Sequence, residues 1–228
     1  MLFRSIGWDS KEQDAYKVAE HTLLKTSGIV AEPLKLDRLQ ASGLLRRLVD
    51  WRGQPWDLPS SAPCSTEFSI SRFLVPIICQ SGPALFTDCD VVFMDDVRKL
   101  LAHFDESKAV MVVKHNHIAD GSKMGGLQQS AYTRKNWSSV MLFNCDHPAN
   151  KRLTVVDVNE RPGRDLHQFY WLHDSEIGEL PAEWNWLVGC QPKPKFPKLA
   201  HYTLGGPWIK NWQPAEHDDL WLKTFNSL

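Results

Sequence analysis

Residues 83–96, Pro-Ala-Leu-Phe-Thr-Asp-Cys-Asp-Val-Val-Phe-Met-Asp-Asp, decide how the rest of this chain folds. The apolar run at residues 84–86 predicts a buried strand, and it leads directly into the turn Asp88-Cys89-Asp90. Ligands bind at the carboxyl ends of strands in open α/β sheets, and two carboxylates on one short turn suit a hard divalent cation that bridges phosphates. The stretch therefore predicts an Asp-x-Asp metal site at the end of a core strand.

A structural alternative explains the same acidic residues without a metal. Aspartates in turns bond to their own backbone, so Asp88 and Asp90 could serve only to stabilise the turn. For Asp95 and Asp96 this alternative is preferred, because residues 97–104 are predicted to form a helix that either aspartate could cap. The sequence alone leaves both interpretations of Asp88 and Asp90 open.

The length and charge of the chain limit its partners. At 228 residues it suits a single large domain with a substantial core. Its 26 basic and 27 acidic side chains give a net charge of −1, which provides no general attraction for nucleic acid or an anionic membrane. Two local basic segments, residues 193–198 and Arg134-Lys135, are interpreted as solvated loop charge. We therefore expect neither kind of partner.

The cysteines and the apolar runs bear on the cellular compartment. Five cysteines are an odd number and include no Cys-x-x-Cys pair, so neither a disulfide framework nor a zinc–thiolate site is indicated. The first residues lack the apolar stretch of a signal peptide, and no run approaches the roughly 20 apolar residues of a membrane span. We therefore expect a cytoplasmic protein without a transmembrane segment.

The chain opens with a strand–helix–strand pattern typical of nucleotide-binding α/β domains. A strand at residues 2–6 precedes a helix that opens at Asp14 and stops at Gly28, and a second strand follows at residues 29–36. The later predicted elements are a helix at 39–49, a loop at 51–63, a helix at 66–79 interrupted at Pro76, strands at 109–114 and 138–143, a loop at 121–130, a helix at 166–172, an aromatic turn and short strand at 180–187, a linker at 192–197 and a strand that ends near residue 201.

Aromatic residues are concentrated in the second half of the chain. Seven of the ten tryptophans follow residue 136. Either an aromatic-lined surface or a second, smaller core explains this clustering. The core is preferred, because large aromatic side chains contribute most when they are buried.

Several polar side chains outside the acidic turn are candidates for a ligand site. Arg72, the one basic group of its predicted helix, is either a surface charge or a donor fork aimed at a phosphate. His115 and His117 lie on one face of a strand and could chelate a metal, although the only close carboxylate is Asp120. His201 at a strand end is either a structural histidine or a third metal ligand.

The turn that follows His201 suits a phosphorylated ligand. Gly205-Gly206 would let the backbone approach a diphosphate closely. Lys210 would supply positive charge beside it.

Five motifs, spread in order over nearly the whole chain, carry a family resemblance. They are Ser65-Thr-Glu-Phe-Ser-Ile-Ser-Arg-Phe73, Phe86-Thr-Asp-Cys-Asp90, Lys135-Asn-Trp-Ser-Ser-Val-Met-Leu-Phe-Asn144, Leu180-Pro-Ala-Glu-Trp-Asn185 and His201-Tyr-Thr-Leu-Gly-Gly-Pro-Trp208. With them the chain resembles the glycogenin and lipopolysaccharide-galactosyltransferase-like family of nucleotide-sugar glycosyltransferases, and more closely a set of bacterial and phage members.

The resemblance implies a single GT-A-type, Rossmann-like α/β domain over residues 1–228. Its sheet would be mixed and mostly parallel, flanked by helices, with a small aromatic-rich C-terminal portion. Residues 1–150 would bind the nucleotide-sugar, and residues 151–228 would form the acceptor side and complete the metal site.

The resemblance also implies roles for individual residues. Asp88 and Asp90 would hold Mn²⁺ or Mg²⁺ against the two phosphates of the donor, and His201 would complete the metal shell. The other implied donor-binding residues are Trp8 and Asp9 for the base and ribose, and Arg72, Gly205, Gly206 and Lys210 for the phosphates.

The chain departs from the family pattern at two places, in the parts of the site that would bind the donor sugar and the acceptor. Where the family has Asn-Ala/Ser-Gly-Val, this chain has Trp137-Ser-Ser-Val140, so the sugar-binding asparagine is missing. Where the family has Asp-Gln-Asp, a gapless count lands on Asp165-Leu-His167, with Gln168 one step later. The resemblance therefore makes Asp165 and Gln168 candidate catalytic residues. Asp174 is a further catalytic candidate, and Asp174 or Glu176 would be the base of an inverting enzyme, although both also suit a turn start or a helix cap.

The expected function is that of a hexosyltransferase. It would move a sugar from a nucleoside diphosphate, UDP, to a glycan or other hydroxyl acceptor with retention of anomeric configuration. One rival is a haloacid-dehalogenase-like phosphatase, which also has a strand-end Asp-x-Asp but places it on the first strand. The other is a carbohydrate- or nucleotide-binding module without turnover, whose tryptophans serve as sugar platforms.

Overall fold

A six-stranded sheet forms the centre of the computed structural model, which describes residues 3–115 and 134–228. Five strands run in one direction, and the third strand across the sheet runs against them. In order across the sheet they are β10 (Ile177–Glu179), β8 (Val110–Val112), β9 (Val140–Asn144), β6 (Pro83–Thr87), β1 (Phe3–Gly7) and β2 (Glu32–Leu34). The predicted mixed, mostly parallel α/β architecture is therefore confirmed.

The opening strand–helix–strand unit is also confirmed. Helix α1 (Gln13–Ser27) ends where Gly28 takes a left-handed φ of 66° and donates its N–H to the last turn at 2.8 Å. The second strand, β2, is shorter than predicted. It lies at the edge of the sheet, a position that tolerates Pro33, which has no N–H to donate to a neighbouring strand.

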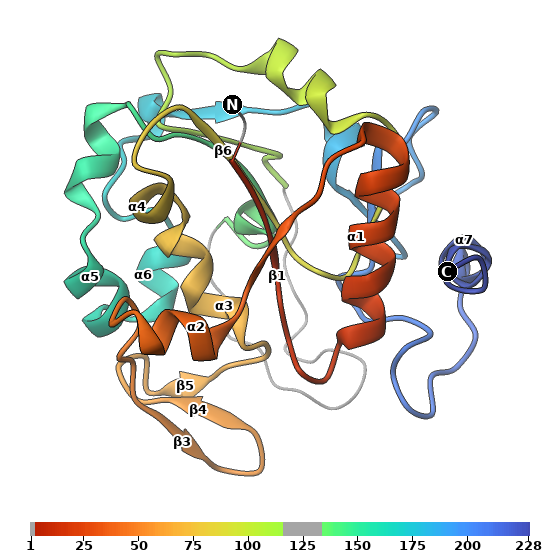
Figure 1. The fold of residues 1–228 in the computed structure, drawn as a ribbon, viewed down its shortest axis with the longest axis horizontal. Coiled ribbons are helices and arrows are strands. Elements are labelled where there is room, and N and C mark those ends of the chain that lie inside the picture. The colour runs from red at the N-terminus through yellow and green to blue at the C-terminus, as the bar shows by residue number, and fades with distance from the viewer. Residues whose placement is uncertain (1–2, 116–133) are drawn as a thin grey trace.

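The predicted helix at residues 39–49 and the predicted loop at residues 51–63 are both wrong. Helix α2 (Leu36–Ala41) begins earlier and ends early, because Gly43 takes a left-handed φ of 73° and turns the chain. The residues that follow form a small antiparallel sheet, which projects from the body of the protein (Figure 1). Its strands are β3 (Val49–Trp51), β4 (Pro55–Asp57) and β5 (Ala62–Pro63).

The predicted helix at residues 66–79 is present but interrupted. Helix α3 (Phe68–Ser71) passes through one 3-10 turn, η1 (Arg72–Leu74), into α4 (Val75–Cys79). Pro76 has no N–H to donate to the carbonyl four residues earlier, which explains the break. Arg72 lies in this turn and is buried.

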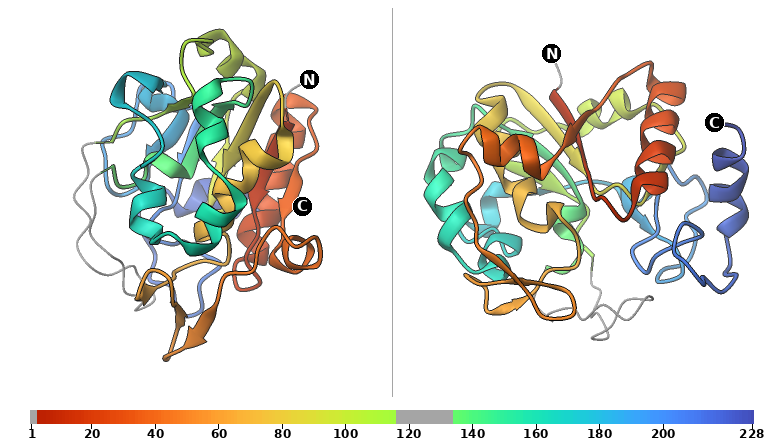
Figure 2. Two further views of the ribbon diagram at one scale, coloured as in Figure 1. Left: turned by 90° about the vertical axis from the view of Figure 1, so that its left-hand side faces the viewer. Right: turned by 60° about the horizontal axis from the view of Figure 1, so that its bottom comes forward.

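A second, three-stranded sheet combines distant parts of the chain. Its order is β11 (Trp186–Leu187), β12 (Leu199–His201) and β7 (Val91–Phe93), with β12 antiparallel to β7. Helix α7 (Asp218–Phe225), for which the sequence made no prediction, lies outside α1 (Figure 2). A separate cluster of buried side chains joins these elements: Val18, Val92, Trp186, Val188, Ala200, Tyr202 and Trp221. The predicted second core is therefore confirmed.

Shorter elements correct the remaining predictions. The helix predicted at residues 97–104 is a 3-10 helix, η2 (Val97–His103), which Asp96 caps as predicted by accepting a hydrogen bond from Arg98 N at 2.9 Å. The helix predicted at residues 166–172 is limited to α6 (Gly163–His167), because Phe169 takes a left-handed φ of 54°. The other elements are η3 (Trp137–Ser139), η4 (Pro148–Arg152), α5 (Val155–Glu160), η5 (Asp174–Glu176) and η6 (Ala182–Asn185).

The helices cover both faces of the main sheet. Figure 1 shows α3 to α6 on one side of β1 and β6, and α1 with α7 on the other. No helix within residues 3–115 and 134–228 is long and apolar enough to cross a membrane. The predicted loop at 121–130, together with His117 and Asp120, lies outside the described residues.

Candidate functional site

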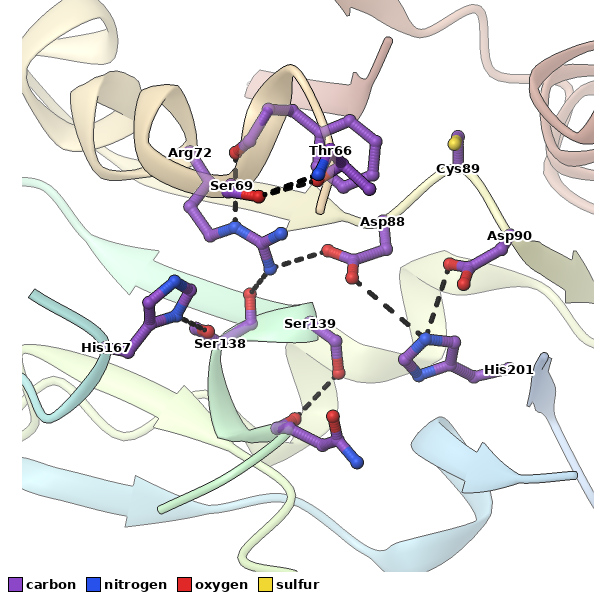
Figure 3. A network of polar contacts seen from close by, with 12 residues as sticks. Thr66, Ser69, Arg72, Asp88, Cys89, Asp90, Ser138, Ser139, His167 and His201 are labelled. Atoms are coloured by element: carbon purple, nitrogen blue, oxygen red, sulfur yellow. Dashed lines mark hydrogen bonds and ion pairs between the residues drawn. The ribbon is translucent and has the colours of Figure 1, made fainter. Parts of the chain in front are cut away.

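Asp88, Asp90 and His201 meet where the two sheets adjoin. Asp88 follows the central strand β6, Asp90 precedes β7, and His201 ends β12, which pairs His201 with Val91 across the small sheet. One ligand atom from each of the three side chains lies within 4.8 Å of the others. His201 Nε2 is 3.3 Å from Asp90 Oδ1 and 4.0 Å from Asp88 Oδ2 (Figure 3). The structure therefore brings together the three residues predicted as metal ligands.

Backbone hydrogen bonds hold the acidic turn between the two sheets. Asp88 N donates to Ser139 O at 2.9 Å, and Tyr202 N donates to Asp90 O at 2.9 Å. The Cys89 thiol donates to Glu12 Oε2 at 3.2 Å, beside the start of α1. Burial, together with the charge of Glu12, raises the pKa of Cys89, so the group stays a thiol. The turn is thus fixed with both carboxylates directed at His201.

The donor set fits a divalent cation. Asp90 and His201 are buried, with 4% and 1% of their surface exposed, and Asp88 is partly buried. Two carboxylate oxygens and one imidazole nitrogen are ligands that Mn²⁺ accepts, and Mg²⁺ favours the two oxygens. In contrast, Asp95 and Asp96 pair with the exposed side chains of Lys99 and Arg98, as expected for structural residues.

Arg72 is buried beside Asp88, so the alternative of a surface charge is wrong. Its Nη1 donates to Asp88 Oδ1 at 2.7 Å and to Ser138 O at 2.8 Å, and its Nε donates to Phe68 O at 3.3 Å (Figure 3). Nη2 makes no hydrogen bond to the described residues. The guanidinium can therefore donate to a further anionic group next to the acidic turn.

His167 lies in a small polar cavity beside Arg72. Its Nδ1 is 2.7 Å from Ser138 Oγ, and burial, together with Arg72 and Lys135, lowers its pKa well below the ordinary value. The imidazole is therefore neutral at pH 7. The cavity, of about 60 Å³, is lined by Ser65, Ser69, Arg72, Asp88, Lys135, Asn136, Ser138, Ser139, His167 and Thr203.

The predicted catalytic residues do not line this cavity. Among the described residues, its lining includes His167 but not Asp165, Gln168 or Asp174. Asp165 pairs with Arg164 at 3.4 Å, and Asp174 is almost fully exposed and pairs with Arg134. No contact within residues 3–115 and 134–228 assigns these three a catalytic role, so they stay predictions.

Sequence reasoning missed two side chains that the structure brings into the site. His167 is one, and the signal available was its place in the Asp165-Leu-His167 stretch, at the position of an acidic residue in the family pattern. Asn185 is the other: it is fully buried and bonds to His201 Nδ1 at 2.9 Å. Its motif was recognised, but its contact with His201 joins residues 16 apart and no local pattern predicts it.

Trp8 and Asp9 line a groove of about 880 Å³ between the end of β1, the start of α2 and the small β3–β5 sheet. The Asp9 carboxylate accepts from the backbone N–H groups of Lys11 at 2.8 Å and Glu67 at 2.9 Å, so it shapes one end of the groove. Lys35 Nζ lies 4.8 Å from the centre of the Trp8 ring. The groove therefore combines aromatic faces with positive charge.

The glycine turn has a packing requirement of its own. Gly205 has a φ of 108°, and a Cβ there would lie 2.4 Å from Ile209 Cδ1. A Cβ on Gly206 would lie 2.2 Å from the Trp208 ring. Lys210, just beyond, is exposed. Gly205 is thus required by its backbone conformation, and Gly206 leaves room for Trp208, which packs against the second core.

Several solved structures with a similar fold are glycosyltransferases. GlyE of Streptococcus pneumoniae TIGR4 has a TM-score of 0.60 at 12% identity, over 99% of this chain and 60% of GlyE, so the chain spans less than two thirds of that protein. An active-site mutant of LgtC, a galactosyltransferase, has a TM-score of 0.59 at 13% identity, over 100% of this chain and 96% of LgtC. Mouse xyloside xylosyltransferase 1 has a TM-score of 0.51 at 11% identity, over 91% of this chain and 100% of the mouse chain. The fold is therefore that of GT-A-type glycosyltransferases.

Comparison of sequences gives a relative with much higher identity than these structures have. No family model matches the chain. Protein CDI of Arabidopsis thaliana, however, is 40% identical over 224 residues, which cover 95% of this chain and 83% of the plant protein. The narrower resemblance to the glycogenin family stays a prediction. Since it shares two fifths of its residues with that protein over nearly its whole length, the chain belongs to the family of Protein CDI.

Proposed function

We propose that the chain is a metal-dependent glycosyltransferase. It moves a hexose from a nucleoside diphosphate, UDP, to a hydroxyl group of a glycan or other acceptor, with retention of configuration. The observation that carries the proposal is the convergence of Asp88, Asp90 and His201 on one point, with Arg72 beside them, at the end of the central strand. The shared GT-A-type fold supports it.

The donor would lie across two features already described. Its base and ribose would enter the groove beside Trp8 and Asp9, where planar aromatic faces are available. Its diphosphate would reach Asp88 and Asp90 through a bound Mn²⁺ or Mg²⁺. The turn at Gly205-Gly206 and the Lys210 side chain would approach the phosphates from the C-terminal portion. In this arrangement residues 1–150 bind most of the donor, and residues 151–228 complete the metal site and face the acceptor.

The reaction mainly requires that negative charge on the leaving group be stabilised, because the leaving group is a nucleoside diphosphate. Asp88, Asp90 and His201 would hold a divalent cation, which would supply positive charge beside the β-phosphate. Arg72 would donate through Nη2 to a phosphate oxygen as the charge on that oxygen grows. The negative charge that develops on the leaving diphosphate would thereby be stabilised, and the protein would not need to protonate the leaving group.

The acceptor side favours retention over inversion. An inverting enzyme needs a carboxylate base on the face opposite the leaving group. Glu176 accepts from His173 N in a capping box and pairs with Arg152 at 2.5 Å, and Asp174 pairs with Arg134. Both are engaged in structural contacts. We propose instead that a departing phosphate oxygen takes the acceptor proton on the same face, with Asp165 and Gln168 placing the acceptor.

The rival functions have less support. A haloacid-dehalogenase-like phosphatase would carry its Asp-x-Asp on the first strand, whereas here the motif follows β6. A binding module without turnover would use the same groove and has no observation of its own in its favour. Trapping with beryllium fluoride would reveal a phospho-aspartate, and binding of a donor without hydrolysis or transfer would indicate a binding module.

A donor screen tests the proposal directly. Nucleoside diphosphates and their sugars are added with Mn²⁺ or with a chelator, and thermal unfolding is followed. A donor at 100 times its dissociation constant adds about 2.7 kcal/mol of stability. We expect UDP-linked compounds to stabilise the protein only with Mn²⁺. Equal stabilisation with chelator, or none by any donor, would contradict the proposal. Proton NMR of the first product then reports the anomer.

A further inference from the structure

The amide of Asn185 has a fixed orientation in the protein interior. Its Nδ2 lies 2.9 Å from Ser139 Oγ and 3.4 Å from Asn136 O. Ser139 Oγ donates its own hydrogen to the same Asn136 carbonyl at 2.7 Å, so it offers only lone pairs to Asn185. Both neighbours on this side of the amide are therefore acceptors. The nitrogen of Asn185 must face them, and its oxygen must face His201.

This orientation selects one tautomer of His201. Asn185 Oδ1 can only accept, so the imidazole nitrogen 2.9 Å away, Nδ1, carries the hydrogen. In the neutral ring the other nitrogen, Nε2, then keeps its lone pair. Nε2 is the atom that faces Asp90 and Asp88. The imidazole is thus presented in the form that can bind a cation.

We propose that Asn185 is a positioning residue for the metal ligand His201. It holds the Nδ1–H tautomer and directs Nε2 at the point where the two carboxylates converge, and Ser139 sets the orientation of Asn185. The Ser139 carbonyl also accepts a hydrogen bond from Asp88 N at 2.9 Å. Ser139 therefore contacts both the acidic turn and the Asn185 amide that orients His201. The metal part of this inference rests on the proposed function, whereas the tautomer does not.

Nitrogen NMR of the metal-free protein tests the tautomer. Long-range ¹H–¹⁵N spectra of His201, assigned by comparison with His201→Gln, distinguish a protonated from an unprotonated ring nitrogen. We expect a protonated Nδ1 and an unprotonated Nε2 in the neutral ring. A neutral ring with its proton on Nε2 would overturn the proposal.

Titration with Mn²⁺ alone tests the consequence for binding. Asn185→Leu keeps the volume and removes the acceptor, and outer-shell partners of this kind are worth about 10–100-fold in metal affinity. We expect a loss in that range. Asn185→Asp keeps an oxygen for His201 Nδ1 and should restore most of the affinity, which a merely structural role would not predict.

A matched control separates positioning from general damage. Asn150 is also buried, and its amide bonds to Ala109 O and Asn144 O at 2.8 Å. Asn150→Leu should lower stability and leave Mn²⁺ affinity unchanged. Asn185→Leu protein that binds Mn²⁺ as tightly as the wild type would overturn the role of Asn185. Wild-type protein that binds Mn²⁺ with the expected tautomer but transfers no sugar would overturn only the proposed function.

Discussion

The six-stranded and the three-stranded sheets differ in whether their strands can be recognised from local sequence patterns. The main sheet is built from apolar runs such as β9, in which every residue is buried. The small sheet has strands of two or three residues, and its pairing of β12 with β7 joins segments about a hundred residues apart. The acidic turn connects the two, since Asp88 leaves one sheet and Asp90 enters the other. The main sheet thus defines the fold, and the small sheet completes the site.

The largest effect is expected where the sheets meet. Asp90→Asn should leave the protein folded and lower transfer by roughly 10³-fold, because charge stabilisation by a metal is worth several kcal/mol and about 1.4 kcal/mol is tenfold. Calorimetry should show no metal-dependent donor binding. Asp96→Asn, six residues on and only a helix cap, should keep both. Unchanged donor affinity in Asp90→Asn would remove the metal from the mechanism.

Stability should reveal the separate core of the small sheet. Trp221→Ala removes a buried ring that stacks on Phe225 at 4.9 Å, so the free energy of unfolding should fall by about 3–5 kcal/mol. Urea unfolding measures it, and Mn²⁺ affinity should fall as β12 loosens. Trp51→Ala, in the exposed strand β3, should change stability by less than about 0.5 kcal/mol. Similar losses in the two variants would contradict a second core.

Substitution of Arg72 tests how much the residues beside the main sheet contribute to catalysis. Arg72→Ala should lower kcat by about 10²-fold and change KM much less, because the charge that it meets grows toward the transition state. Steady-state kinetics at a temperature where the variant is folded would measure this, and Arg72→Lys should recover part of the loss. Arg98→Ala, at an exposed pair, serves as the control. An effect confined to KM would assign Arg72 to ground-state binding.

The smallest expected effect concerns pH and His167. The pKa of His167 is lowered by burial, so the native protein does not bind the proton that the unfolded chain takes up below about pH 6.5. Its contribution to stability is therefore complete above that pH and is lost below it, by up to about 1.4 kcal/mol per pH unit. His167→Gln should flatten the dependence measured by urea unfolding between about pH 5 and 7. His173→Gln, at an exposed site, should not. Parallel profiles for His167→Gln and the wild type would refute this assignment.

The sequence predicted the elements whose signals are local. The apolar run before Asp88 and the glycine stop at Gly28 each lie within a few residues of the feature they determine, and both predictions hold. The helix predicted at residues 39–49 failed for a local reason as well, because the left-handed turn at Gly43 outweighs the helical pattern around it.

The candidate site could be predicted only in part. The turn Asp88-Cys89-Asp90 and the strand-end position of His201 are visible in the sequence. The contacts from Ser138 to His167 and from Asn185 to His201 arise only after β9, α6 and β12 have packed together. Arg72 is likewise buried in the turn η1 through its contact with Asp88, and a helical pattern gives no sign of which face will meet Asp88.

The pairing of β12 with β7 also predicts where the family can vary in length. His201 lies opposite Val91, and side chains alternate between faces along a strand, so a slip of one residue would turn His201 away from the acidic turn. The segment at residues 189–197, between β11 and β12, contributes no strand, and longer or shorter loops cost little free energy. Insertions and deletions among relatives should therefore collect in that segment and stop before Leu199.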